Sequence, residues 1–92
     1  MSVYAITYDL HGPSKDYENL FEELKSFGPY SHPLESFWFV DTNLEAKEIR
    51  DRLKNVMDSD DSLLVFQVRC HWASWNIPKS HTDWLKSENR NF

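Results

Sequence analysis

The stretch from Val3 to Leu10 is apolar on both of its faces, and it constrains the fold more than any other segment. Successive side chains of a β-strand point to opposite sides. In VYAITYDL the alternating sets are Val3, Ala5 and Thr7 on one side, and Tyr4, Ile6, Tyr8 and Leu10 on the other. Because both sets are largely apolar, the segment is predicted to be a central strand that is covered on two sides.

A first helix is predicted between Ser14 and Gly28. Ser14 would cap the first turn, and the acidic residues after it suit the positive end of the helix dipole. Gly28 and Pro29 would end the helix. Apolar side chains recur at helical spacing between these limits: Tyr17, Leu20, Phe21, Leu24 and Phe27.

A second helix is predicted after Thr42, where the sequence TNLE matches a capping box with Thr42 as the cap and Glu45 reaching back. Its apolar stripe is Ala46, Ile49, Leu53 and Val56. Strands are predicted on either side of it, at 36–40 and 63–68. Residues 30–35 contain Pro33, which cannot donate to a ladder, so they are expected to form an edge, a bulge or a separate short strand.

This order predicts an α+β fold of the ferredoxin-like β-α-β-β-α-β type in one domain over residues 1–92. The core would span 3–68, and 69–92 would form an irregular tail in which residues 80–83 start one short helix. The two main helices would cover one face of the sheet. The other face would be covered by the tail or by a second copy of the chain, so a homodimer is expected.

The composition disfavours nucleic acid as a partner of the isolated domain. Fifteen acidic residues oppose ten Lys and Arg, which gives a net charge of −5, whereas phosphate binding favours a basic excess. An acidic surface also suits a basic protein partner. The single cysteine, Cys70, excludes an intramolecular disulfide and fits a cytoplasmic location. No apolar run is long enough to span a membrane, and the first residues lack the basic flank of a signal peptide.

Asp9 is the main candidate for chemistry. It ends the predicted central strand, just before a Gly-Pro loop, where a metal ion or substrate can reach it. If two chains pack about an axis near this strand end, two Asp9 carboxylates could share one Mg²⁺. Tyr8, Ser36 and His11 are candidate supporting residues. The alternative is structural: Asp9 would accept backbone hydrogen bonds in the loop, Tyr8 would be core and Ser36 a ladder residue.

Two other segments have a structural and a functional interpretation. The acidic run at 58–62 lacks the glycine and the final glutamate of a calcium-binding loop and is predicted to be a turn. The HWASW segment at 71–75 has two Trp rings, which could stack on bases or pack against the sheet or a partner chain.

The chain resembles the SinR-like family of small bacterial and phage proteins, which is itself similar to CRISPR-associated protein 2 and to virulence-associated protein D. The likeness lies in YAITYDL (4–10), ESFWFVDTNL (35–44), the stretch 51–53 and SLLVFQV (62–68). It implies a ferredoxin-like homodimer in which Asp9 occupies the place of a proposed metal ligand and Ser36 that of a second-strand serine. The first helix departs from those relatives, which carry basic residues early in this helix, because Lys15 is the only basic residue in its early part, KDYENLFEEL.

Three functions follow as hypotheses. The first is a homodimeric interaction module linked to nucleic-acid metabolism or phage defence. The second is a Mg²⁺-dependent endoribonuclease or endonuclease that uses Asp9 from two chains. The third is an antitoxin or counter-defence protein with an exposed acidic patch. The second hypothesis requires basic side chains near Asp9, and the candidates are Arg50, Arg52, Lys54, Arg69 and Lys79.

Overall fold

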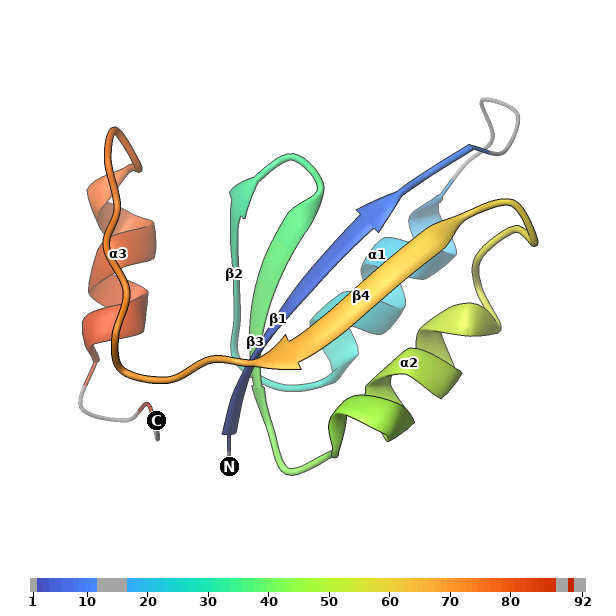
Figure 1. Cartoon of the computed structure of the whole chain (residues 1–92), viewed down its shortest axis with the longest axis horizontal. Helices are drawn as coiled ribbons and strands as arrows, with labels where there is room; N and C mark the ends of the chain where they lie inside the picture. The colour runs from blue at the N-terminus through green and yellow to red at the C-terminus, as the bar shows by residue number, and fades with distance from the viewer. Residues whose placement is uncertain (1, 12–16, 88–89, 91–92) are drawn as a thin grey trace.

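The computed structural model describes residues 2–11, 17–87 and 90, and it is an α+β structure with a four-stranded sheet and three helices in those ranges (Figure 1). The elements in chain order are β1 (Ser2–Asp9), α1 (Glu18–Ser26), β2 (Tyr30–Leu34), β3 (Phe37–Thr42), α2 (Ala46–Lys54), β4 (Ser62–Gln67) and α3 (Lys79–Lys86). Within the described ranges, no helix is both long and apolar enough to cross a membrane.

The sheet is antiparallel throughout, with the strand order β2-β3-β1-β4. β1 therefore lies between β3 and β4, which confirms the prediction of a central strand. Its register places Ile6 opposite Trp38 on β3 and Val65 on β4. The register of β2 with β3 is interrupted between Ser31 and Leu34, around Pro33, as expected of a proline in an edge strand.

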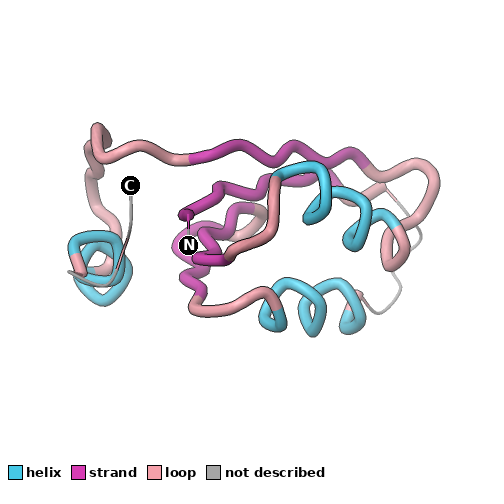
Figure 2. The backbone as a smooth tube through the Cα atoms, turned by 90° about the horizontal axis from the view of Figure 1, so that it is seen from below, coloured by secondary structure: helices cyan, strands magenta, loops and turns pink. Residues whose placement is uncertain are grey.

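Helices α1 and α2 cover one face of the sheet (Figure 2). The core between these layers contains fully buried side chains from all three elements: Ile6, Leu20, Leu24, Ile49 and Leu53. Burying a side chain of this size contributes about 1.5–3 kcal/mol. The apolar stripes predicted for both helices therefore supply this core, and β1 places Tyr4, Ile6 and Tyr8 against them.

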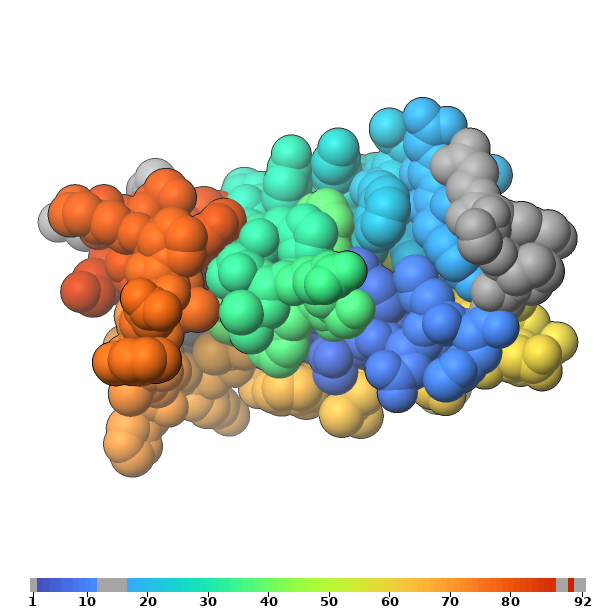
Figure 3. All heavy atoms as spheres, turned by 90° about the horizontal axis from the view of Figure 1, so that it is seen from above, coloured from blue at the N-terminus to red at the C-terminus, as the bar shows by residue number. Residues whose placement is uncertain are grey.

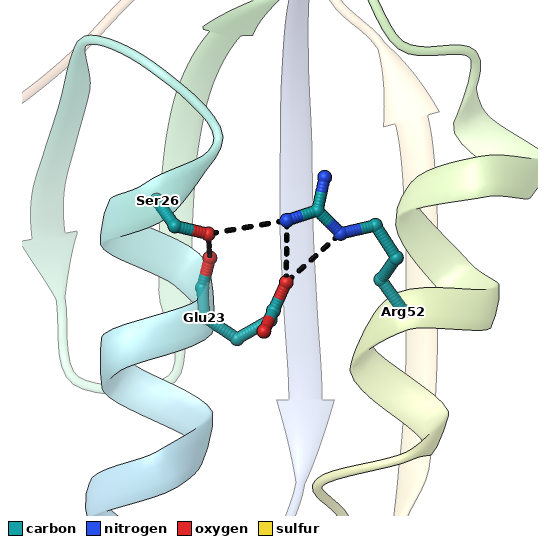
Figure 4. Close-up of polar contacts among 3 residues, drawn as sticks. All are labelled: Glu23, Ser26 and Arg52. Carbon is teal, nitrogen blue, oxygen red and sulfur yellow. Dashed lines mark hydrogen bonds and ion pairs between the residues drawn. The ribbon is translucent and has the colours of Figure 1, made fainter.

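Arg52 joins the two helices at their solvent side (Figure 4). Its guanidinium contacts Oε2 of Glu23 through Nε at 2.9 Å and Nη2 at 2.7 Å. Nη2 also donates to the Ser26 hydroxyl at 3.4 Å, and that hydroxyl donates to the Glu23 carbonyl at 2.6 Å. The guanidinium lies 4.8 Å from the centre of the Phe27 ring. One side chain thus fixes α1 against α2.

The helix starts differ from the predictions. Thr42 does not cap α2, because it is still paired in β3 opposite Ser2; its hydroxyl accepts the N–H of Leu44 instead. The cap of α2 is Glu45, whose N–H donates to Oε1 of Glu48 at 3.0 Å. The predicted box therefore exists one turn later in the chain. Helix α1 begins at Glu18, and the predicted cap Ser14 lies outside the described residues.

The C-terminal segment is more regular than predicted, because α3 runs over eight residues from Lys79. It stands beside the β2–β3 hairpin (Figure 3). The Ser31 hydroxyl and Nδ1 of His81 share a hydrogen bond of 2.7 Å. The rings of Phe39 and Trp84 stack with their centres 6.4 Å apart. The tail thus covers the β2–β3 side of the sheet face that α1 and α2 leave free.

The acidic run at 58–62 forms the turn that was predicted. The N–H of Asp61 donates to the carbonyl of Asp58 at 3.0 Å, and the N–H of Asp58 donates to Oδ2 of Asp61 at 2.8 Å. The Asp61 carboxylate therefore serves the backbone of its own turn, immediately before β4 begins at Ser62.

Candidate functional site

Asp9 is the exposed last residue of β1, opposite Ser62 at the start of β4. By strand alternation it shares a face with Thr7, away from α1 and α2. It borders a shallow hollow of about 180 Å³ that Thr7 and Leu64 also line. The carboxylate is therefore accessible to solvent and to a partner, as the metal hypothesis requires.

Tyr8 lies on the opposite side of β1, within the helix-covered core. Its hydroxyl accepts a hydrogen bond from Nε1 of Trp38 at 3.1 Å and donates to the Glu35 carbonyl at 3.4 Å. Burial raises the pKa of the Tyr8 phenol; the Trp38 hydrogen bond acts in the other direction and the Glu35 charge adds to the increase. Tyr8 is thus a buried polar link between β1 and the β2–β3 turn, and its hydroxyl points away from Asp9.

The other two candidate residues form backbone hydrogen bonds, and neither of these bonds reaches Asp9. Ser36 is exposed in the β2–β3 turn, and its carbonyl accepts the N–H of Tyr8 at 3.2 Å. His11 is exposed two residues after Asp9, and its N–H donates to Oδ1 of Asp61 at 2.7 Å. Within the described residues, no three His, Cys, Asp or Glu side chains form a group that could hold a metal ion. A metal ion at Asp9 would take its further ligands from water or from a second chain.

Three of the basic candidates are paired away from Asp9. Arg52 contacts Glu23 between the helices, on the other side of the sheet. Arg50 lies on α2, and its hydrogen bond lowers the pKa of Asp51. Lys79 lies on α3, and its hydrogen bond with Asp83 raises the lysine pKa. These basic residues are scattered over the molecule, which weighs against a nucleic-acid channel at Asp9.

The sheet face that α1 and α2 leave free is largely apolar, and we refer to it as the open face. Strand register arranges it in rows. The row nearest Asp9 is Phe37, Thr7 and Leu64, and the next row is Phe39, Ala5 and Phe66. Leu64 is 59% exposed and Phe66 44%. Single exposed apolar residues are ordinary, but neighbours on one sheet face mark an interaction surface.

A groove of about 490 Å³ lies between the second row of the open face and the C-terminal segment. Ala5, Phe39 and Phe66 line its sheet side. Trp72, Ile77 and Leu85 line the opposite side. The two Trp residues of HWASW were the one signal for it in the sequence. The groove itself was not predictable, because its two walls are far apart in the chain and meet only through the position of α3.

The comparisons with known proteins add no family to this description: no protein-family model matches the chain, and no solved structure matches it either.

Proposed function

We propose that the chain is a homodimeric interaction module with ferredoxin-like topology, and that two copies pair through the Leu64 row of the open face. The element order and the antiparallel strand order β2-β3-β1-β4 support the ferredoxin-like description. The resemblance to CRISPR-associated protein 2 would place such a pair in nucleic-acid metabolism or phage defence.

The exposure of Leu64 is the observation that carries this proposal. Leu64 is more than half exposed on a sheet face, and Leu34 at the nearby hairpin end is 53% exposed. Each chain carries a net charge of −5, so two copies repel each other over most orientations. Phe37, Thr7 and Leu64 carry no charge, and contact through this row buries apolar area without bringing like charges into the centre.

Sedimentation velocity over a range of protein concentrations tests the pairing. The wild-type chain is expected to dimerise, and Leu64→Glu is expected to remain monomeric because each pair would bury two carboxylates. The matched control is Asn19→Glu, which adds the same charge at an exposed position of α1. A wild-type chain that is monomeric at every concentration, or a Leu64→Glu variant that still dimerises, would exclude pairing through this row.

A metal-dependent nuclease is the second candidate, and the position of Asp9 favours it. Asp9 lies beside the Leu64 row on the same face, so pairing through this row would bring two carboxylates toward the interface. Two carboxylates near one axis repel each other unless a divalent cation lies between them. The paired chains would then supply the ligands that a single chain lacks.

Two measurements test the nuclease. Mg²⁺ is expected to strengthen dimerisation of the wild type and to leave Asp9→Asn unchanged. Cleavage of single-stranded RNA or double-stranded DNA with Mg²⁺ or Mn²⁺ is expected in the wild type and lost in Asp9→Asn and in Leu64→Glu. Cleavage that persists in Asp9→Asn, or dimerisation that does not respond to Mg²⁺, would remove Asp9 as a metal ligand and leave the interaction module.

A further inference from the structure

We propose that the groove between the open face and the C-terminal segment binds a small planar aromatic molecule that carries one negative charge. Leu64, which carries the proposed pairing, does not line this groove, although its neighbours Phe37 and Leu34 do, so a Leu64 variant is used below to separate the two proposals. Its volume of about 490 Å³ lies within the range of small-molecule sites, which is about 300–1,000 Å³.

The groove is held in shape by contacts between α3 and the sheet. His81 and Ser31 share a hydrogen bond of 2.7 Å, which fixes α3 to the edge strand β2. The Trp84 ring stacks on the Phe39 ring. The Phe39 ring also meets the Phe37 ring edge to face, with the ring centres 5.2 Å apart. Leu85 is buried on the groove side of the helix. A site that is formed before binding does not lose affinity to the ordering of its walls.

The walls of the groove present flat apolar rings. Phe39 and Phe66 lie on the sheet side, and Trp72 and Trp75 lie on the C-terminal segment. Trp75 is 87% exposed, although it borders an apolar groove. Asn76 follows it with a φ of 61°, a left-handed conformation that Asn adopts at lower cost than most residues. An aromatic ligand would stack on these rings and cover the Trp75 side chain.

The charge around the groove selects an anion. The chain has fifteen acidic residues, yet no Asp or Glu lines the groove among the described residues. The charged and titratable groups that do line it are Arg69, His71 and His81. Arg69 is exposed and forms no ion pair with a described residue, so its guanidinium can contact a carboxylate or phosphate.

The negative net charge of the chain favours a ligand with a single negative charge over one with many. One anionic group can contact Arg69 locally, whereas a nucleic-acid strand would extend its phosphates over a surface with a net charge of −5. The aromatic walls and the single unpaired arginine therefore fit a small aromatic acid better than a polynucleotide.

The experiment uses the full chain, labelled with ¹⁵N, and titrates it with 2-naphthoate, while the indole N–H resonances are followed by NMR. The neutral analogue 2-naphthamide tests the charge, and cyclohexanecarboxylate tests the aromatic ring. We expect 2-naphthoate to shift the resonances of Trp72 and Trp75 and to leave that of Trp38, which lies in the helix-side core. We expect both analogues to bind about tenfold more weakly.

Arg69→Gln is expected to remove the preference for 2-naphthoate over 2-naphthamide, and Arg69→Lys to retain most of it. The matched control is Arg50→Gln, which removes the same charge from α2, outside the groove. Equal affinity for the charged and neutral probes, no shift at Trp72 and Trp75, or an Arg69→Gln variant that keeps the preference would each overturn the proposal. Tighter binding of oligothymidylate at the same resonances would replace it with a single-strand site.

The Leu64→Glu variant, which is expected to be monomeric, separates this site from the pairing. We expect the variant and the wild type to bind 2-naphthoate equally, whether or not the wild type dimerises. Loss of probe binding in a folded Leu64→Glu variant would show that the groove exists only in the pair, which would overturn a site within one chain.

Discussion

Arg90 donates a hydrogen bond from Nη1 to Oδ2 of Asp41 across 2.9 Å, and the two side chains are only 10% and 3% exposed. Asp41 belongs to β3 and faces the tail side of the sheet, opposite Val3. The Arg90 guanidinium also lies 3.9 Å from the ring centre of Trp84. Nε of Arg90 donates a hydrogen bond to the Trp84 carbonyl at 3.1 Å. The tail therefore neutralises a buried carboxylate of the sheet.

Removing this arginine is expected to destabilise the chain strongly. Arg90→Met leaves the Asp41 carboxylate buried without a countercharge, and breaking a buried pair in this way costs about 3 kcal/mol. Among the described residues, Oδ1 of Asp41 has no hydrogen-bond partner, so no other contact replaces the lost one. Urea unfolding measures the change.

The double variant Asp41→Asn, Arg90→Met is the control for this prediction, because the amide carries no charge. It is expected to recover part of the lost stability, with a coupling of about 1 kcal/mol or more between the two positions. Strictly additive effects of the two substitutions would mean that the pair contributes nothing beyond its separate side chains.

Replacing Tyr8 by Phe is expected to cost about 1–2 kcal/mol, because the buried Nε1 of Trp38 loses its acceptor. The matched control is Tyr4→Phe on the same face of β1. The Tyr4 hydroxyl has no hydrogen bond to a described side chain, so this variant should stay within about 0.5 kcal/mol of the wild type. Equal losses in the two variants would contradict the assigned role of the Tyr8–Trp38 bond.

The same tyrosine gives a pH dependence. Its pKa is raised above the ordinary value of 10.0, chiefly by burial. At a pH just above that value, the unfolded chain has released the phenol proton and the folded chain still holds it, so a further increase in pH favours unfolding. The stability that Tyr8 contributes is complete below pH 10.0 and is lost as the pH rises through the folded-state pKa.

Unfolding of the wild type and of Tyr8→Phe, measured from neutral to alkaline pH, tests this dependence. The difference in free energy of unfolding between the two is expected to stay constant below pH 10.0 and to shrink above it. A difference that grows with pH would mean that the folded protein stabilises the ionised phenol.

The central position of β1 and the helix-side core followed from periodicity. Alternation along β1 predicted a central strand, and the helical stripes around Leu20 and Ile49 predicted the covering layer. The start of α2 was misassigned between two positions, because TNLE matches the S/T-x-x-E capping pattern, whereas the observed cap, Glu45 in EAKE, does not. Pairing of Thr42 with Ser2 decides between them, and a local pattern does not contain that long-range contact.

The candidate site was predicted less well. Alternation alone places Tyr8 and Asp9 on opposite faces, so their separation was readable from the sequence. The accessible position of Asp9 was predicted as well. The groove was not, because the position of α3 beside β2, which sets the C-terminal wall against the row of Phe39 and Phe66, depends on long-range contacts. The Arg90–Asp41 pair joins residues that no local pattern connects.

The start of α2 offers a test of the corrected cap. Glu48 accepts the N–H of Glu45, which would otherwise have no intrahelical partner. Glu48→Ala is expected to cost about 0.5–1 kcal/mol, and Glu48→Gln is expected to lose less, because the amide oxygen can still accept this bond. Thr42→Val tests the Thr42 hydroxyl separately. A loss from Glu48→Ala no larger than that from Glu48→Gln would remove the cap assignment.

The Arg52 contact between α1 and α2 has an ionic and an aromatic part, and salt separates them. The partly exposed pair with Glu23 is expected to contribute about 0.5–1 kcal/mol at low ionic strength and less at high salt. Contact with the Phe27 ring is much less sensitive to salt, because part of it is burial of apolar surface. Arg52→Ala should therefore destabilise the chain at both ionic strengths, with a smaller loss at high salt.

Arg50→Ala is the control, because its pair with Asp51 joins neighbours on the exposed surface of α2, and no measurable change in stability is expected. An Arg52→Ala loss that vanishes at high salt would show that the contact is purely ionic.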